Sequence, residues 1–255
     1  MAKPYLSIII PAYNEAKRLP LTLIDVDRIL SRAEYSYEIL IMNDGSTDNT
    51  AEIAKKMSGN IKNLKVVDNP VNRGKGAVVR DGMLIAQGNI RLFTDADNST
   101  SIDHFDGMTE HFRAGYDVVI CSRSVKGAKL DPPESVYRQI PGKLGNLFVQ
   151  ALLLPGIWDT QCGFKAFSER ATEEIFGMMK ITGWGFDIEA LALAKKLGYK
   201  IKEIPAHWVN AEGSKLKASA YLKVLLETVK IRLWLWGGKY QLNTNNNQQI
   251  TNRTQ

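Results

Sequence analysis

Two aspartates separated by a single alanine follow a short apolar run in the first half of the chain. The run is "NIRLFTDA", residues 89–96, and the aspartates are Asp95 and Asp97. Alternate side chains of a strand point to the same side, so two carboxylates at this spacing repel each other unless a cation lies close by. Mg²⁺ and Mn²⁺ bind few carboxylates and complete their shells with water and phosphate oxygens. The spacing is consistent with a metal ion that holds a diphosphate, and also with two carboxylates that cap the next helix and face water.

A glycine-rich stretch is a second candidate for an anion site. The stretch "NRGKGA", residues 72–77, is either the beginning of a helix or a set of free backbone N–H groups that bind an anion. The turn after the first predicted strand, "PAYNEAKR" at residues 11–18, contains no glycine, and the chain has no G-x-x-x-x-G-K-[ST] sequence. These two absences argue against a dinucleotide-dependent oxidoreductase and against a P-loop phosphotransferase.

The elements that must position these residues alternate along the first half of the chain. Apolar runs typical of buried strands are separated by helical patterns, and the runs span residues 5–13, 37–44, 63–69, 89–96 and 117–123. This alternation predicts an α/β fold with a mostly parallel sheet flanked by helices. Ligands of such sheets bind beyond the carboxyl ends of the strands. The polar residues expected at these ends are Glu15, Asp44, Asn69, Asp95 and Asp97.

The second half of the chain shows looser patterns. Helical spacing recurs over residues 143–154 and again over residues 217–236. The second of these stretches predicts a C-terminal amphipathic helix, which either packs on the domain or lies on a membrane surface. Residues 241–255 are polar and of low complexity, and we expect them to be disordered. We therefore predict one domain over residues 1–240, followed by a tail.

The composition limits the partners of the chain. Of its 255 residues, 44% are hydrophobic and 24% are charged, as in an ordinary globular domain. The net charge of +6 fits an anionic partner, but the basic residues are dispersed, and we expect no nucleic-acid binding. No signal peptide or long apolar stretch is visible, so we expect that the chain does not cross a membrane by itself. Cys121 and Cys162 are expected to be buried thiols in a reducing compartment.

Five short motifs, in this order, carry a resemblance to a known family. They are "IIIPAYNE" (8–15), "NDGSTDNT" (43–50), "NRGKGA" (72–77), "TDADNST" (94–100) and "DTQCGFK" (159–165). Together they resemble the inverting glycosyltransferases of family 2, which have the GT-A fold. Within that family they are most similar to the polyprenyl-phosphate sugar synthases, above all the dolichyl-phosphate β-glucosyltransferases. Each motif alone is weakly specific, whereas the ordered set is strongly specific.

The resemblance implies a nucleotide-sugar site at the carboxyl edge of the sheet. In such a site Glu15 lies near the base or the ribose, and Asp44 contacts the edge of the base. Asp95 contacts the ribose and the metal ion, and Asp97 binds the metal ion. Some relatives have a further metal-binding side chain two residues later, where this chain has Ser99. The implied nucleotide-sugar residues are Pro11, Ala12, Tyr13, Glu15, Asp44, Gly74, Lys75, Asp95 and Ala96.

The same resemblance implies residues that act on the acceptor. The implied contacts to the acceptor phosphate are Arg123, Arg138 and Lys215. The implied catalytic residues are Asp97, Asp159, Arg123 and Arg138. Asp159 is either a base for a hydroxyl acceptor or a structural group that caps a helix or holds an arginine, and Asp187 has the same alternatives. Some relatives carry an arginine shortly before G-S-K, where this chain reads "NAEGSK".

The activity implied by the resemblance is inverting, metal-dependent transfer of a hexose to a polyprenyl or dolichyl phosphate. The implied donor is UDP-glucose, and the implied cofactor is Mg²⁺ or Mn²⁺. A phosphate monoester has a second pKa of ~6, so its oxygen needs no strong base.

Three alternatives stay open. The chain is also consistent with a GDP-mannose-dependent polyprenyl-phosphate mannose synthase, with a family 2 enzyme that acts on a sugar hydroxyl in polysaccharide or glycolipid assembly, and with a non-catalytic nucleotide-sugar-binding protein. The implied location is cytoplasmic and peripheral to the inner face of the membrane. An anchoring partner or a homo-oligomer would then assist membrane attachment.

Overall fold

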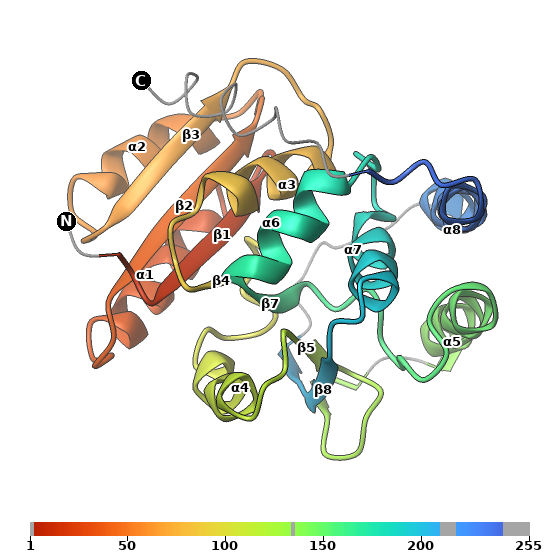
Figure 1. The fold of residues 1–255 in the computed structure, drawn as a ribbon. Coiled ribbons are helices and arrows are strands. Elements are labelled where there is room, and N and C mark those ends of the chain that lie inside the picture. The colour runs from red at the N-terminus through yellow and green to blue at the C-terminus, as the bar shows by residue number, and fades with distance from the viewer. Residues whose placement is uncertain (1–2, 134–135, 210–217, 242–255) are drawn as a thin grey trace.

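A seven-stranded sheet forms the centre of the molecule (Figure 1). The computed structural model describes residues 3–133, 136–209 and 218–241. In spatial order the strands are β3 (Leu64–Asn69), β2 (Tyr37–Asp44), β1 (Leu6–Ala12), β4 (Ile90–Thr94), β7 (Phe164–Ser168), β5 (Val118–Ser122) and β8 (Ile201–Pro205). All neighbouring strands are parallel except for the two pairs that contain β7. The predicted mostly parallel α/β sheet is confirmed.

Helices cover both faces of this sheet (Figure 1). The helices on one face are α1 (Leu19–Leu30), α2 (Thr50–Ser58) and α4 (His104–Arg113), and those on the other are α3 (Lys75–Ile85), α6 (Glu169–Met178) and α7 (Phe186–Lys196). Because both faces are covered, the central strands are apolar along their length, and all seven residues of β1 are buried. Cys121 and Cys162 are buried free thiols, and burial raises the pKa of Cys162 to about 12.

A small second sheet lies next to the carboxyl edge of the large one. It pairs β6 (Lys129–Asp131) with β9 (His207–Val209) in parallel. The N–H of Val209 donates to the carbonyl of Ser99 at 2.8 Å, and the N–H of His207 donates to His104 Nε2 at 2.9 Å. The segment that follows the acidic pair is therefore held against β9.

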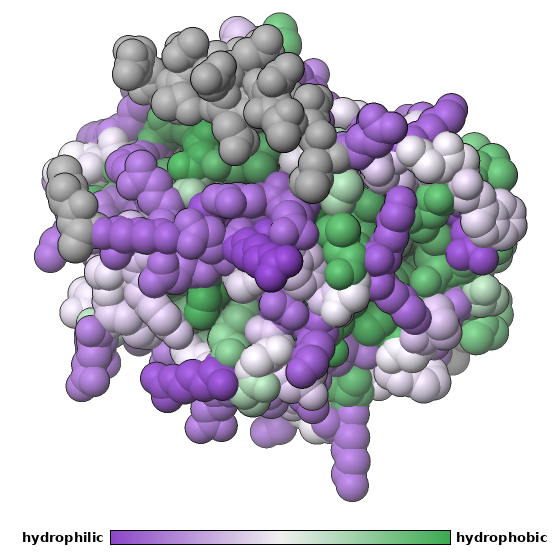
Figure 2. Space-filling view, in the orientation of Figure 1, coloured by the Kyte–Doolittle hydropathy of each residue, from purple (hydrophilic) through white to green (hydrophobic). Residues whose placement is uncertain are grey.

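Two long helices, α5 (Val136–Leu152) and α8 (Ala218–Trp236), pack against each other. The buried side of α8 contains Val224, Thr228 and Ile231. The apolar stripe expected from the sequence points largely outward, and its exposed residues are Leu222, Val229, Leu233 and Trp236. Apolar side chains therefore lie on both sides of α8, and the simple amphipathic pattern is not confirmed. Figure 2 shows apolar surface, in green, on the side of the molecule where α5 and α8 lie.

Several element boundaries differ from those expected from the sequence. Helix α5 begins seven residues before the predicted stretch 143–154 and runs through Pro141. Strand β7 lies in a motif that was not predicted as a strand. Residues 242–255 of the predicted tail lie outside the described residues. Over the described ranges, none of the helices combines the length and the apolar character that a bilayer crossing requires.

Candidate active site

The acidic pair lies in the turn that follows β4, at the carboxyl edge of the sheet. Asp95 Oδ1 accepts a hydrogen bond from Lys75 Nζ at 2.5 Å, and both side chains are largely buried. Asp97 Oδ1 accepts the backbone N–H of Ser99 at 3.0 Å. The first residue of α3 thus places a positive charge beside Asp95, whereas the cation inferred from the spacing was a divalent metal ion.

A glycine of the "DTQCGFK" motif packs directly against Asp95. Thr94 of β4 pairs with Phe164 of β7, which brings Gly163 beside the aspartate. A Cβ atom at position 163 would lie 2.1 Å from Asp95 Oδ2 and 2.5 Å from its Cγ. Only glycine leaves room for the carboxylate in this position. Two motifs that are distant in the sequence therefore form one unit of the site.

Asp44, at the end of β2, fixes the turn that begins α3. Its two carboxylate oxygens accept the N–H groups of Arg73 at 2.7 Å and Gly74 at 2.9 Å. Gly74 has a φ of +94°, and a Cβ atom there would lie 2.4 Å from the carbonyl oxygen of Thr182. The same carbonyl accepts the N–H of Gly76 at 2.9 Å. Because these N–H groups are bonded within the protein, the glycine-rich stretch is better interpreted as a helix start than as an anion site.

A loop before α7 encloses the lysine of this turn. The ammonium of Lys75 lies 5.4 Å from the ring centroid of Trp184 and 5.7 Å from that of Phe186. Burial acts to lower the pKa of Lys75, but the carboxylates of Asp95 and Asp187 outweigh burial and raise this pKa. Lys75 therefore stays positively charged at neutral pH.

The loops after β1 and β2 are fastened to each other. Asn14 Oδ1 accepts the N–H of Thr47 at 2.8 Å, and the N–H of Asn14 donates to Ser46 Oγ at 3.0 Å. The N–H of Glu15 donates to Thr50 Oγ1 at 2.8 Å. The structure therefore gathers the predicted nucleotide residues at one edge of the sheet. Those at the ends of β1, β2 and β4 are Pro11, Ala12, Tyr13, Glu15, Asp44, Asp95 and Ala96.

Arg18, which the sequence analysis missed, adds a second cation at this edge. Its Nε and Nη2 donate to the two carboxylate oxygens of Glu15 at 2.7 and 2.5 Å. The hydrogen bond to Glu15 is the main cause that raises the pKa of Arg18, and the negative charges of Asp97 and Asp95 raise it further. The sequence could have indicated this ion pair, because side chains three residues apart on a helical turn lie close together.

The sequence matches the family model described as "Glycosyl transferase family 2" over residues 7–176, which is two thirds of the chain. The chain belongs to glycosyltransferase family 2. It is 39% identical over 244 residues to a dolichyl-phosphate beta-glucosyltransferase of Dictyostelium discoideum, with 89% of this chain and 74% of that protein covered. It is 30% identical over 252 residues to the Homo sapiens protein of the same name, with 93% and 78% covered.

Solved structures share the fold of this family 2 enzyme at lower identity. Glucosyl-3-phosphoglycerate synthase of Mycobacterium tuberculosis, in complex with Mn²⁺, UDP-glucose and phosphoglyceric acid, aligns with a TM-score of 0.68 and 18% identity, over 92% of this chain and 80% of that one. Mannosyl-3-phosphoglycerate synthase of Rubrobacter xylanophilus aligns with the same TM-score and identity, over 95% and 78%. The GT-A fold and the glycosyltransferase class expected from the motifs are confirmed.

In this glycosyltransferase, Asp159 holds an arginine. Arg123 donates from Nε to Asp159 Oδ2 at 2.7 Å, from Nη2 to Oδ1 at 2.9 Å, and from its backbone N–H to Oδ2 at 2.9 Å. The guanidinium of Arg123 also lies 4.8 Å from the ring centroid of Trp208. Burial acts to raise the pKa of Asp159, but Arg123 outweighs burial and lowers this pKa. These contacts favour the structural interpretation of Asp159.

A buried ion pair connects the motif that contains Gly163 to α7. Lys165 Nζ donates at 2.5 Å both to Asp187 Oδ1 and to the carbonyl oxygen of Cys162, and the lysine side chain is fully buried. Burial raises the pKa of Asp187, and the positive charge of Lys165 opposes this effect. Asp187 is therefore the partner of a buried lysine. Lys165 is the one charged residue in the apolar sequence "GFKAF", and this charge could have indicated a buried ion pair.

Two predicted contacts to the acceptor phosphate lie beyond what the structure describes. The backbone of Arg138 belongs to α5, but its side chain is outside the described residues, and so is all of Lys215. The roles of both residues stay predictions.

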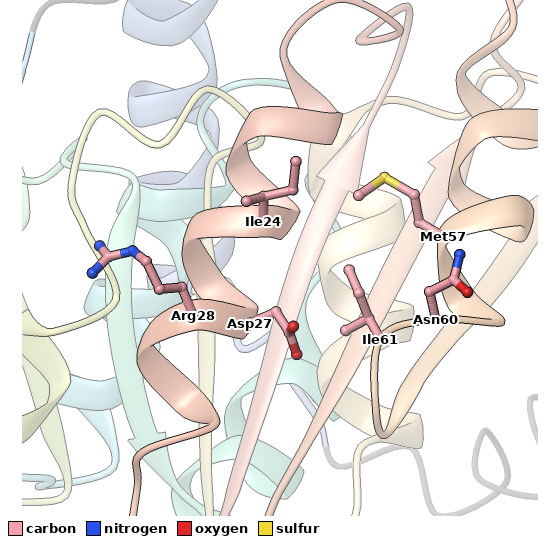
Figure 3. Close-up of a pocket in the computed structure, with 6 residues that line it drawn as sticks. All are labelled: Ile24, Asp27, Arg28, Met57, Asn60 and Ile61. Atoms are coloured by element: carbon pink, nitrogen blue, oxygen red, sulfur yellow. The ribbon is translucent and has the colours of Figure 1, made fainter.

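A hollow between α1 and α2 lies away from the site (Figure 3). It has a volume of about 380 Å³ and is lined by Ile24, Asp27, Arg28, Met57, Asn60 and Ile61. These residues belong to the middle and C-terminal part of α1, to the end of α2 and to the turn after α2. None of the predicted site residues lines this hollow.

The acidic pair fits a hard divalent ion. Mg²⁺ and Mn²⁺ are held by one or two carboxylates, while water and substrate phosphates fill the other positions. Asp95 and Asp97 supply two such groups on the turn after β4, with Ala96 alone between them in the sequence. Over the described ranges, no cluster of three or more His, Cys, Asp and Glu side chains is placed to hold a metal ion. Two carboxylates on one turn suit an ion that shares its shell with a diphosphate.

Proposed function

We propose that this glycosyltransferase transfers glucose from UDP-glucose to a dolichyl or other polyprenyl phosphate, with inversion at the anomeric carbon. The relatives named dolichyl-phosphate beta-glucosyltransferase support this proposal, since the chain covers 74% and 78% of the two compared above. The observation that carries it is the ion pair of Lys75 and Asp95 against Gly163 at the carboxyl edge of the sheet, with Asp97 on the same turn.

In this proposal, Asp95 and Asp97 hold Mg²⁺ or Mn²⁺ against the donor. Such an ion would supply positive charge that stabilises the diphosphate leaving group. Lys75 stays charged beside Asp95 and adds a positive charge at the same place. Gly163 leaves room for the Asp95 carboxylate in the position that it takes beside Lys75.

A phosphate acceptor suits this site better than a sugar hydroxyl. A hydroxyl must lose its proton to a base, whereas a phosphate oxygen with a second pKa of ~6 is already ionised. Asp159 is bound by Arg123 and has a lowered pKa, and Asp187 is bound by Lys165. Neither aspartate is available as a strong base. The cationic contacts that we assign to the acceptor phosphate are Arg123, Arg138 and Lys215.

We further propose that the enzyme works as a peripheral protein on the cytoplasmic face of a membrane. Leu147 of α5, with Leu226 and Trp236 of α8, are each at least 60% exposed. Arg232 holds its charge 4.4 Å from the ring centroid of Trp236. Exposed apolar side chains mixed with basic ones are typical of helices that lie on anionic lipid surfaces. A protein partner or a second copy of the chain would strengthen the attachment.

The test is a transfer assay with purified enzyme, Mn²⁺ and a polyprenyl phosphate in vesicles. UDP-glucose, UDP-galactose and GDP-mannose are compared as donors, and we expect glucose transfer to the lipid phosphate in the β configuration. Asp97→Asn should abolish transfer. Asp103→Asn changes an exposed aspartate just before α4 and should leave transfer unchanged. Preference for GDP-mannose, or transfer only to a sugar hydroxyl, would overturn the proposal.

A further inference from the structure

Glu227 of α8 reaches into the loop that encloses Lys75. Its Oε2 accepts the N–H of Gly185 at 2.7 Å. A Cβ atom at Gly183 would lie 2.5 Å from Glu227 Oε1, and a Cβ atom at Gly185 would lie 2.6 Å from Oε2. The two glycines therefore form a cradle that fits this carboxylate, and a larger side chain at either position would displace it.

The loop is attached in turn to the proposed donor site. The carbonyl of Thr182 accepts the N–H of Gly76, in the first turn of α3, at 2.9 Å. The ring of Trp184, between the two glycines of the cradle, lies 5.4 Å from Lys75 Nζ. Lys75 donates to Asp95 at 2.5 Å. A continuous line of contacts therefore runs from α8 through the loop to an aspartate that we assign to the metal ion.

A second contact ties Tyr240, which follows α8, to the beginning of the same loop and lies apart from the glycine cradle. The hydroxyl of Tyr240 donates to Glu189 Oε1 at 2.8 Å, and Glu189 Oε2 accepts the N–H of Ile181 at 2.8 Å. Loss of the Tyr240 contact weakens the attachment of the segment after α8 and leaves the glycine cradle intact. Tyr240 therefore offers a matched control for Glu227.

We propose that Glu227 is a positioning residue of the donor site. Its carboxylate holds the loop of Gly183 and Gly185, and through this loop it sets Lys75 and Asp95 in the arrangement that binds the metal ion and the diphosphate. This inference rests on the proposed function for the identity of the donor. It also gives α8, which carries the exposed apolar side chains, a role in donor binding. Without the carboxylate, a loop with two glycines loses the acceptor that orders it.

Two measurements separate this role from a merely structural one. Isothermal titration of UDP in the presence of Mn²⁺ gives donor-site affinity, and the transfer assay gives KM for UDP-glucose and kcat. We expect Glu227→Ala to weaken UDP affinity and to raise KM about tenfold, or about 1.4 kcal/mol, with a smaller change in kcat. Glu227→Gln keeps an oxygen for the N–H of Gly185 and should restore most of the affinity. Tyr240→Phe should leave both quantities unchanged.

A double-mutant cycle gives the sharpest result. The three atoms nearest to a Cβ atom at Gly183 all belong to the carboxyl group of Glu227. Gly183→Ala alone should therefore raise KM by displacing the carboxylate, at little cost in stability because a flexible side chain moves. In a protein that already carries Glu227→Ala, Gly183→Ala should not raise KM any further. Additive effects would show that the two positions act independently and would overturn the proposal.

The outcomes also separate this inference from the proposed function. If Glu227→Ala keeps wild-type UDP affinity and KM while the wild type transfers glucose to the lipid phosphate, the inference is wrong and the function stands. If the wild type transfers no glucose, the proposed function is wrong, and UDP affinity in the variants still decides the role of Glu227. If Glu227→Ala does not fold, Gly183→Ala decides, since unchanged UDP affinity in that variant contradicts the role.

Discussion

Replacement of Gly163 by alanine tests the contact that sets Asp95. The new Cβ atom would lie 2.1 Å from Asp95 Oδ2, whereas ordinary contact begins at 3.4 Å. The carboxylate must therefore retreat by roughly 1.3 Å. Gly163 is not among the residues of positive φ in the described part of the chain, so alanine introduces no backbone strain there. The effect of the substitution falls on the position of the carboxylate.

The size of the effect follows from this displacement. A shift of about 1 Å in a reacting geometry costs on the order of 100-fold in rate. We therefore expect kcat/KM for UDP-glucose to fall about 100-fold, which corresponds to about 2.7 kcal/mol. We expect the free energy of unfolding to fall by only about 1 kcal/mol, because the short Asp95 side chain can rotate away from its preferred rotamer. A large loss of activity with a small loss of stability is the expected signature.

Steady-state kinetics, titration of UDP with Mn²⁺ and thermal unfolding measure these quantities. Gly177→Ala in α6 is the matched control, since a Cβ atom there meets nothing within 4 Å. Alanine also favours the helix by about 0.5–1 kcal/mol, so this control should keep wild-type kinetics and melt slightly higher. Wild-type kcat/KM and UDP affinity in Gly163→Ala would refute the argument that this contact sets Asp95.

Three other outcomes follow from contacts described above. Lys165→Met leaves Asp187 buried without its cation, and we expect a loss of about 3–5 kcal/mol in the free energy of unfolding at neutral pH, measured by urea denaturation. Burial already raises the pKa of Asp187 in the folded protein, so the carboxyl group takes up a proton as the pH falls. The loss in the free energy of unfolding should therefore shrink at lower pH, and a loss that does not depend on pH would contradict the ion pair. Asp159→Asn should lower kcat about tenfold, whereas near-complete loss of kcat would identify Asp159 as a base. The variant should also lack the stability that Asp159 gives the wild type above about pH 4. The wild type loses this stability as the pH falls through the lowered pKa of Asp159. Leu226→Glu, on the exposed side of α8, should prevent flotation with anionic vesicles at low salt without a change in Tm, and unchanged flotation would exclude this side as the membrane contact.

The sheet was predictable because its strands carry a strong local signal. Continuous apolar runs indicated strands that are buried on both faces, and the polar residues after them marked the carboxyl edge. Strand β7 escaped prediction because Lys165 interrupts its apolar sequence. The charge of this lysine is neutralised by Asp187, which lies 22 positions away in the sequence. The burial of a charged side chain that depends on a partner far away in the sequence leaves no pattern in the residues around it.

The acidic pair could be found from the sequence, but its neighbours could not. The spacing of Asp95 and Asp97 indicated a site for a metal ion, but it did not indicate that Lys75 lies beside Asp95. The partner of Asp159 is 36 positions away, and only the fold shows that this partner is Arg123. Helical periodicity found an apolar stripe in α8 but did not reveal which side of the helix faces the domain. Packing against α5 and α7 decides that question.

The most direct test of the account is Mn²⁺ binding by the acidic pair in the presence of UDP. The electron paramagnetic resonance signal of free Mn²⁺ measures this binding during a titration. The wild type and Asp103→Asn should each bind one ion per chain. Uptake should weaken at least about tenfold in Asp95→Asn and in Asp97→Asn, because each loses a charged oxygen ligand. Equal uptake of Mn²⁺ by the wild type and by both of these variants would contradict the central claim.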